Sequence, residues 1–248
     1  MRRRHLIGLI LLVVLGPGPL LSFDIDLDRE PNNPNLFQFV RIRYNGFGGG
    51  FGSRRWGPPP WMHDYPRAEK NFLKILMEVT TVPTTTESYL ILDLDDPAIM
   101  EYPFLYVSEP GYWAVTPKEI QNLREYFDRG GFVVFDDFRG APEWSNLVRA
   151  MKQVDPKRSF ELLTPVHPIF HCFYDIESLD MIPPSRIRGS GLPRFFGWSD
   201  AEGRIQAVAN FNNDIGDYWE WSDEAINPLN SNEAYKFGIN YVIYSLTH

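Results

Sequence analysis

The first candidates for chemistry are two adjacent carboxylates, Asp136 and Asp137, which follow an apolar run at residues 132–135. A short apolar run bounded by polar residues is typical of a buried strand, so we expect both acids where that strand ends. Two carboxylates there could hold a cation, act as a general base or fix a sugar hydroxyl. The alternative is that one acid caps the next helix while the other pairs with Arg139.

His63 is the third catalytic candidate. It comes directly before Asp64 and two residues after Trp61. A histidine beside a carboxylate can act as a base or a metal ligand, and the N-terminus of a helix expected from residue 66 would favour a bound anion. Trp61 could stack on a sugar or peptide, so Trp61 and Asp64 are ligand-binding candidates. The alternative for Asp64 is an ordinary helix cap.

The densest polar segment is residues 212–220, in which Asp214, Asp217 and Glu220 recur every third residue. A turn or a single helical coil could bring these acids together, and we count Asp214 and Asp217 as ligand-binding candidates. The segment lacks the ligand pattern of an EF-hand loop, which argues against dedicated calcium binding. The alternative is a solvated acidic loop.

His167 and His171 are the only candidate metal-binding histidine pair, four residues apart. On a helix they would share one face, but Pro168 allows a helix to begin only there, which weakens the pair. Cys172 follows His171 directly, a spacing that disfavours a simple Cys–His pair, and we interpret it as a buried small residue. No motif indicates a cofactor, because the chain has no G-x-S-x-G elbow, phosphate-binding loop or H-E-x-x-H pair.

Strands and helices alternate in the part of the chain that would position these residues. Strands are predicted at residues 36–44, 89–92, 104–107 and 132–135, and helices at 66–79, from the capping box at 116–119 to Gly130, and at 144–154. Further strands are predicted at residues 185–188, 194–198 and 205–211, before a closing helix at 232–246. The alternation predicts an open parallel sheet with helices on both faces.

In such a sheet, ligands bind at the carboxyl ends of the strands, near the point where the strand order reverses. We therefore expect Asp137 to line a cleft with Asp214 and with His63 or Asp64. Repulsion between these carboxylates should raise the pKa of at least one of them unless a cation or an arginine compensates. The arginines available for this are Arg41, Arg43 and Arg139.

The composition excludes several classes of protein. The 248 residues carry a net charge of −8, with 44% hydrophobic and 15% aromatic residues, so the chain can bury a core and is not globally disordered. The acidic balance argues against a nucleic-acid partner. A single cysteine excludes an intramolecular disulfide.

The N-terminus has the pattern of an export signal at residues 1–22. Three arginines precede a short apolar run and a glycine–proline helix breaker, and the run is too short to span a membrane. The paired arginines also resemble a twin-arginine signal, and an uncleaved anchor is the one route to membrane contact. Residues 23–35 are predicted to be a linker and residues 36–248 a single domain of an exported, periplasmic or otherwise extracytoplasmic protein.

Several motifs resemble an uncharacterised bacterial family, domain of unknown function 4159. They are FVRIRY at residues 39–44, WMHDYPRAEKN at 61–71, YPFLY at 102–106, GGFVVFDD at 130–137 and NYVIY at 240–244. That family is similar to the class I glutamine amidotransferase-like superfamily, with trehalose-utilisation-type relatives. The resemblance implies a flavodoxin-like three-layer α/β sandwich with a mostly parallel sheet, plus a strand-rich C-terminal elaboration.

The resemblance also bears on chemistry and partners. In active glutamine amidotransferases a nucleophilic cysteine occupies the turn after a strand, where this chain has Asp136 and Asp137 by order of elements. A carboxylate cannot form the thioester, so we expect no glutaminase activity. Some relatives are fused to, or encoded near, von Willebrand-type and MoxR-type components, which implies envelope protein partners.

Two functions of different classes remain open. The first, which the sequence alone favours, is a binding or scaffold domain whose degenerate pocket holds a carbohydrate or peptide. The second is a carbohydrate-active or metal-assisted hydrolase that uses the clustered carboxylates and His63. Convergence of these side chains around a cleft, with perturbed ionisation, would favour the hydrolase, and scattered side chains would favour the binder.

Overall fold

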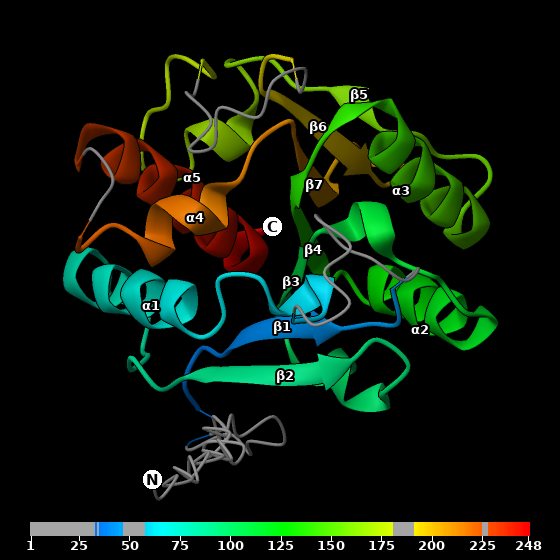
Figure 1. Cartoon of the computed structure of the whole chain (residues 1–248), viewed down its shortest axis with the longest axis horizontal. Helices are drawn as coiled ribbons and strands as arrows, with labels where there is room; N and C mark the ends of the chain where they lie inside the picture. The colour runs from blue at the N-terminus through cyan, green and yellow to red at the C-terminus, as the bar shows by residue number, and fades with distance from the viewer. Residues whose placement is uncertain (1–32, 34, 47–57, 181–190, 225–227) are drawn as a thin grey trace, which may run out of the picture.

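A single mixed sheet forms the centre of the computed structural model, which describes residues 33, 35–46, 58–180, 191–224 and 228–248 (Figure 1). Its strand order is β2-β1-β3-β4-β7-β6-β5. The five strands from β2 to β7 in this order are parallel, and β6 and β5 pair antiparallel to their neighbours. The strands are β1 (Phe39–Arg43), β2 (Tyr89–Asp93), β3 (Phe104–Ser108), β4 (Phe132–Phe138), β5 (Glu161–Leu162), β6 (Arg194–Ser199) and β7 (Ile205–Phe211). The α/β class and the mostly parallel sheet are therefore confirmed.

Helices cover both faces of the sheet (Figure 1). They are α1 (Arg67–Val79), α2 (Pro117–Asp128), α3 (Gly140–Val154), α4 (Ile215–Glu220) and α5 (Pro228–Thr247). Alternate strand residues point to opposite layers, as the pleat requires. Phe39 and Tyr106 pack in the core beneath α1, α4 and α5, whereas Val40 and Leu105 pack in the core beneath α2 and α3.

Local sequence signals predicted some helix starts and missed others. The capping box at the start of α2 is present in full: Thr116 accepts from the backbone of Glu119, and the side chain of Glu119 accepts from the backbone of Thr116. The expected cap of α1 is wrong, because the residue before α1 is Pro66 and no side chain caps it. The closing helix α5 begins at Pro228, four residues before the expected start at residue 232.

The C-terminal strand predictions at residues 194–198 and 205–211 correspond to β6 and β7. The predicted strand at residues 185–188 lies outside the described residues, as does the predicted export signal at residues 1–22. Among the helices of the described part of the chain, none is both long enough and apolar enough to cross a membrane.

The carboxyl edge of the parallel strands is where the backbone departs from ordinary geometry. The strand order reverses between β1 and β3, because the chain leaves β1 for β2 on one side and continues to β4 on the other. Among the described residues, four that are not glycine have positive φ: Asp64 at 66°, Glu109 at 48°, Asp137 at 55° and Asn212 at 58°. Each lies at this edge, after β1 or at the end of β3, β4 or β7. Such conformations cluster at functional sites.

Candidate functional site

Asp136 is a structural anchor at the end of β4. Its carboxylate is fully buried and accepts hydrogen bonds from Tyr106 Oη at 2.7 Å, Asn210 Nδ2 at 3.0 Å and the backbone N–H of Gly216 at 2.9 Å. Burial raises its pKa, and the three donors oppose that shift. With its oxygens engaged, Asp136 ties β4 to β3, β7 and α4, and it has no exposed atom to offer a substrate.

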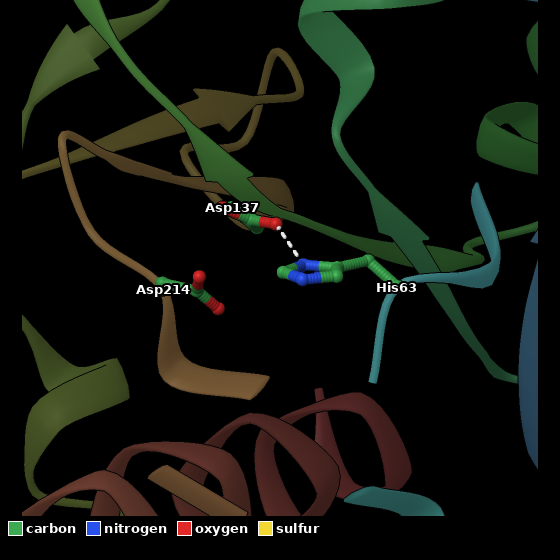
Figure 2. Close-up of side chains that lie close together, drawn as sticks. All are labelled: His63, Asp137 and Asp214. Carbon is green, nitrogen blue, oxygen red and sulfur yellow. Dashed lines mark hydrogen bonds and ion pairs between the residues drawn. The ribbon is translucent and has the colours of Figure 1, made fainter. Parts of the chain in front are cut away.

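The side chain of Asp137 has different neighbours from that of Asp136, because the pairing of β4 with β7 is irregular between Phe135 and Phe138. Its buried carboxylate accepts a hydrogen bond from His63 Nδ1 at 2.6 Å and pairs with Arg139 Nη1 at 2.8 Å (Figure 2). Burial alone would raise the pKa of Asp137, but the hydrogen bond from His63 and the charge of Arg139 lower it below its ordinary value. Asp137 is therefore held ionised inside the protein.

His63 lies in the loop between β1 and α1, and a buried arginine holds that loop in place. Arg41 Nη1 donates to the backbone carbonyls of Trp61 and His63, both at 2.9 Å, while its Nε pairs with Glu69 of α1. The His63 ring is 45% exposed, so it stands at the mouth of the cluster. Its hydrogen bond to Asp137 raises the pKa of His63 to about 10, against the opposing effect of burial.

Asp214 is the residue immediately before α4 and contributes its carboxylate to the site from there. It accepts from the backbone N–H of Asp217 at 3.1 Å as the helix cap, and its other oxygen pairs with Arg139 Nη2 at 2.8 Å. Arg139 thus bridges Asp137 and Asp214. Figure 2 shows that the side chains of His63, Asp137 and Asp214 face a common space. Burial nevertheless raises the pKa of Asp214 well above its ordinary value, with added repulsion from Asp137.

Asp64 is a buried acid whose side-chain oxygens accept no hydrogen bond. Its carboxylate is fully buried, and neither oxygen accepts a hydrogen bond from a donor; His63 Nδ1 is 3.4 Å from Oδ1. The carboxyls of Asp217 and Glu220 lie within hydrogen-bonding reach, and they accept from Asp64 when Asp64 keeps its proton. Burial, with repulsion from Asp137 and Asp217, raises the pKa of Asp64 well above its ordinary value, so this carboxyl keeps its proton over a wider pH range.

Among the residues that the structure describes, two sets of three could hold a metal ion, and both contain His63. The first is His63 with Asp137 and Asp214, and the second is His63 with Asp64 and Asp217; within each set the ligand atoms lie within 4.8 Å of one another. The structure thus brings together His63, Asp64, Asp137, Asp214 and Asp217.

The other candidates lie elsewhere. Trp61 is buried in the core beneath α2 and α3, so its ring packs instead of facing an open surface. His171 donates or accepts at both ring nitrogens, with Asp175 at 3.0 Å and the carbonyl of Pro165 at 2.6 Å, and His167 Nδ1 accepts from the backbone of Ile169. Both histidines therefore have local partners, and neither belongs to a group of three ligands among the described residues.

Sequence reasoning missed Glu109, which follows β3 directly and lies at the same edge. Burial and repulsion from Asp137 raise the pKa of Glu109 to about 8, while His63 lowers it. The signal was available, because Glu109 is the second residue after the apolar run at residues 104–107, as Asp137 is the second after residues 132–135. A carboxyl group with a pKa near neutrality is suited to proton transfer.

Comparison with protein families matches residues 38–246 to the family described as Domain of unknown function (DUF4159). The chain belongs to this family. Comparison with curated proteins gave no match. For this DUF4159 protein, function must therefore be argued from the site itself. The matched region contains every residue of the site, from Arg41 of β1 to Glu220 of α4.

The DUF4159 site combines three chemical capacities. His63 carries a proton at its exposed ring, and Asp137 fixes the ring from the buried side. Glu109 can exchange a proton near neutral pH. The acids Asp64 and Asp217 have ligand atoms within 4.8 Å of those of His63 and could hold a cation. Groups with opposed pKa shifts in one place are what acid–base catalysis requires.

Proposed function

We propose that this DUF4159 protein is a hydrolase whose reacting centre lies at His63. The observation that carries the proposal is the contact of His63 Nδ1 with Asp137 at 2.6 Å, which fixes the ring in a group of converging carboxylates at the carboxyl edge of the sheet. Convergence with perturbed ionisation favours a hydrolase over a simple binding domain. The burial of Trp61 also weakens the case for a ligand stacked on that residue.

The proton transfers follow from the two shifted groups. In the proposed reaction, Glu109 takes a proton from water as the water oxygen attacks the carbon of the substrate. The bond from that carbon to the leaving oxygen breaks, and protonated His63 gives its proton to that oxygen. Asp137 positions His63 and stabilises its charged form. Proton exchange with solvent then returns both groups to their starting states.

A carbohydrate is the substrate class that we propose, because a polar pocket lies at the same edge of the sheet as His63. The pocket has a volume of about 370 Å³ and lies at the carboxyl ends of β1 and β2. It is lined by Arg43, Tyr44, Asn45, Trp61, Asp93, Asp95, Thr116 and Glu119. Carboxylates, an amide and a guanidinium are suited to bind sugar hydroxyls. Trp61 lines the pocket and lies two residues before His63 in the connection between β1 and α1.

We infer that the fold is of the flavodoxin-like type and related to the class I glutamine amidotransferases. The parallel strands β2-β1-β3-β4-β7 follow the order of the flavodoxin-like sheet, with β7 in fifth place. The positive φ of Asp137, between β4 and α3, supports a further likeness, because a nucleophile elbow also places its residue in a strained strand-to-helix turn. In this comparison Asp137 stands where the amidotransferases have cysteine.

The hydrolase proposal is tested with the full-length protein and a panel of chromogenic glycosides. Hydrolysis of at least one glycoside is expected, and His63→Gln should reduce the rate by at least about 100-fold, the usual contribution of a general acid or base. His171→Gln is the matched control, because His171 is also paired with an aspartate but lies outside the site. Equal rates for the two variants, or no hydrolysis of any glycoside, would overturn the proposal.

We also propose that the protein works outside the cytoplasm, in the envelope, on the basis of the arginine-led apolar segment at residues 1–22. Fractionation of cells that express the full chain should recover it outside the cytosol. Changing Arg3 and Arg4 together to lysine distinguishes the export routes, because only a twin-arginine signal requires the pair. Full-length protein confined to the cytosol would contradict the proposal.

A further inference from the structure

The positive groups of the site are distributed unevenly over its carboxylates. Arg139 contacts Asp137 and Asp214, each at 2.8 Å, and Arg41 pairs with Glu69. His63 makes its short contact with Asp137 and stands farther from Asp64, at 3.4 Å. Asp137 and Asp214 therefore have direct counter-charges, whereas Asp64 and Asp217 have no ion pair with an arginine among the described residues and feel the charges of Arg41 and Arg139 only at longer range.

The position of Asp64 is nevertheless fixed by its backbone conformation and by its contact with α4. Its backbone adopts φ of 66°, and its carbonyl accepts the N–H of Ala68 at the start of α1. Its carboxylate rests against the backbone of α4, since a Cβ added to Gly216 would lie 2.5 Å from Asp64 Oδ2. Two buried carboxyls this close are stabilised either by a proton held between them or by a cation that replaces that proton.

We infer that Asp64 and Asp217 bind a divalent cation of the magnesium or manganese type, with His63 beside it. One ion can reach both carboxylates, because their ligand atoms lie within 4.8 Å of one another, and it can reach His63 once that ring has lost its proton. Hard cations take oxygen ligands, and Mg²⁺ sites characteristically use one or two carboxylates and keep several waters. Glu220, which is also within reach of Asp64, offers a further oxygen from the last turn of α4.

The other set, with Asp137 and Asp214, is less suited to the ion. Arg139 already occupies both of those carboxylates, and a cation there would have to displace its guanidinium. At Asp64 and Asp217 no such displacement is needed. The inference rests on the proposed function only for its role: an ion there would hold the attacking water next to the group that moves protons.

The test uses the full-length protein, stripped with EDTA and titrated with MnCl₂ in an isothermal calorimeter. We expect one Mn²⁺ per chain, competition by MgCl₂ and a rise in the unfolding temperature with added Mn²⁺. Asp64→Asn and Asp217→Asn should each weaken binding by more than about 100-fold, because loss of an outer-shell partner alone typically costs 10–100-fold. Asparagine tolerates the positive φ of residue 64, so both variants are expected to fold.

Asp175→Asn is the matched control, since Asp175 also contacts a histidine, His171, but lies outside the site. Binding lost in both site variants and kept in the control supports the inference. No saturable Mn²⁺ binding to the wild-type protein below about 1 mM, the weak limit of natural sites of this kind, overturns it. Binding that survives in both site variants also overturns it.

The cation site and the hydrolase can fail independently, and the Mn²⁺ titration and the glycoside assay together distinguish the two failures. Mn²⁺ bound at Asp64 and Asp217 without hydrolysis of any glycoside leaves the cation site standing and removes the hydrolase. Glycoside hydrolysis at full rate in EDTA, together with no Mn²⁺ binding, removes the cation site and leaves the hydrolase standing.

Discussion

The site contains aspartates of one chemical type in opposite electrostatic circumstances. Asp137 is buried but paired with His63 and Arg139, and its pKa is lowered. Asp64 is equally buried but has no donor, and its pKa is raised. Removing the charge should therefore have opposite effects at the two positions, because one charge is compensated and the other is not.

The first prediction compares Asp137→Asn with Asp64→Asn in the presence of EDTA. Asp137→Asn should lower the free energy of unfolding by about 3 kcal/mol, because it leaves the buried positive charges of His63 and Arg139 with one partner fewer. At a pH above the raised pKa of Asp64, Asp64→Asn should raise that free energy, because it then removes a buried charge that has no direct ion pair. Urea denaturation curves measure both changes, and a shift of the same sign in the two variants would contradict the assignment of charges.

The second prediction concerns the pH dependence of stability in EDTA. The pKa of Glu109 is raised to about 8 and that of His63 to about 10, so the folded protein holds protons that the unfolded chain releases near their ordinary values. The free energy of unfolding should therefore fall as the pH rises from about 4.5 to about 10. Glu109→Gln should flatten the part of this fall below about pH 8, whereas Glu161→Gln, at an exposed position of β5, should not. Urea midpoints across this range provide the measurement.

At the scale of elements, the six-residue helix α4 and its cap supply several residues of the site. It supplies Asp217 and Glu220, its cap is Asp214, and the N–H of Gly216 binds Asp136. Gly216 is required by close packing, because a Cβ there would lie 2.5 Å from Asp64 Oδ2 and 2.8 Å from Tyr106 Oη. The distance between α4 and the β1–α1 loop is thus set by the absence of a side chain.

The third prediction is that Gly216→Ala disrupts the site by displacing Asp64. We expect lower stability, since overpacking a close contact typically costs about 1–3 kcal/mol, together with loss of Mn²⁺ binding. Gly203→Ala is the control: Gly203 has φ of 85° with open space around it, so that variant should lose stability through backbone strain and keep Mn²⁺ binding. Retention of binding in Gly216→Ala would show that Asp64 tolerates displacement.

The sequence predicted elements well where the signal was local. The capping box before α2 and the apolar runs of β3 and β4 depend on neighbouring residues, and all three are present. The irregular pairing that separates the surroundings of Asp136 and Asp137 arises between β4 and β7, which are about 70 residues apart in the chain. The pairing of Arg139 with Asp214 and the burial of Trp61 are long-range in the same way, so no local pattern could reveal them, whereas the pairing of Arg139 with Asp137 is local and was one of the alternatives that the sequence offered.

At the scale of the whole molecule, topology explains why the candidates converge. Parallel strands end at one edge, so loops distant in sequence meet there, and this alone predicted the proximity of His63, Asp137 and Asp214. It could not predict which carboxylate each arginine would neutralise, because that depends on side-chain packing. The same topology separates Cys172 from the site. Cys172 packs against the core beneath α1, α4 and α5, and its thiol donates to the carbonyl of Asn240 on α5 at 3.2 Å.

The fourth prediction is that this DUF4159 protein releases no ammonia from glutamine. Glutaminase chemistry needs a cysteine thiolate at the strand-to-helix turn, and that turn carries Asp137, whose carboxylate cannot form a thioester. Cys172 cannot substitute for it, because burial raises the pKa of its thiol to about 11 and keeps the sulfur protonated at neutral pH. A coupled ammonia assay on the full chain should therefore give the background rate, with no difference between the wild type and Cys172→Ala. Ammonia release that disappears in Cys172→Ala would place a working nucleophile in the layer of α5 and would require the reacting centre to be moved away from His63.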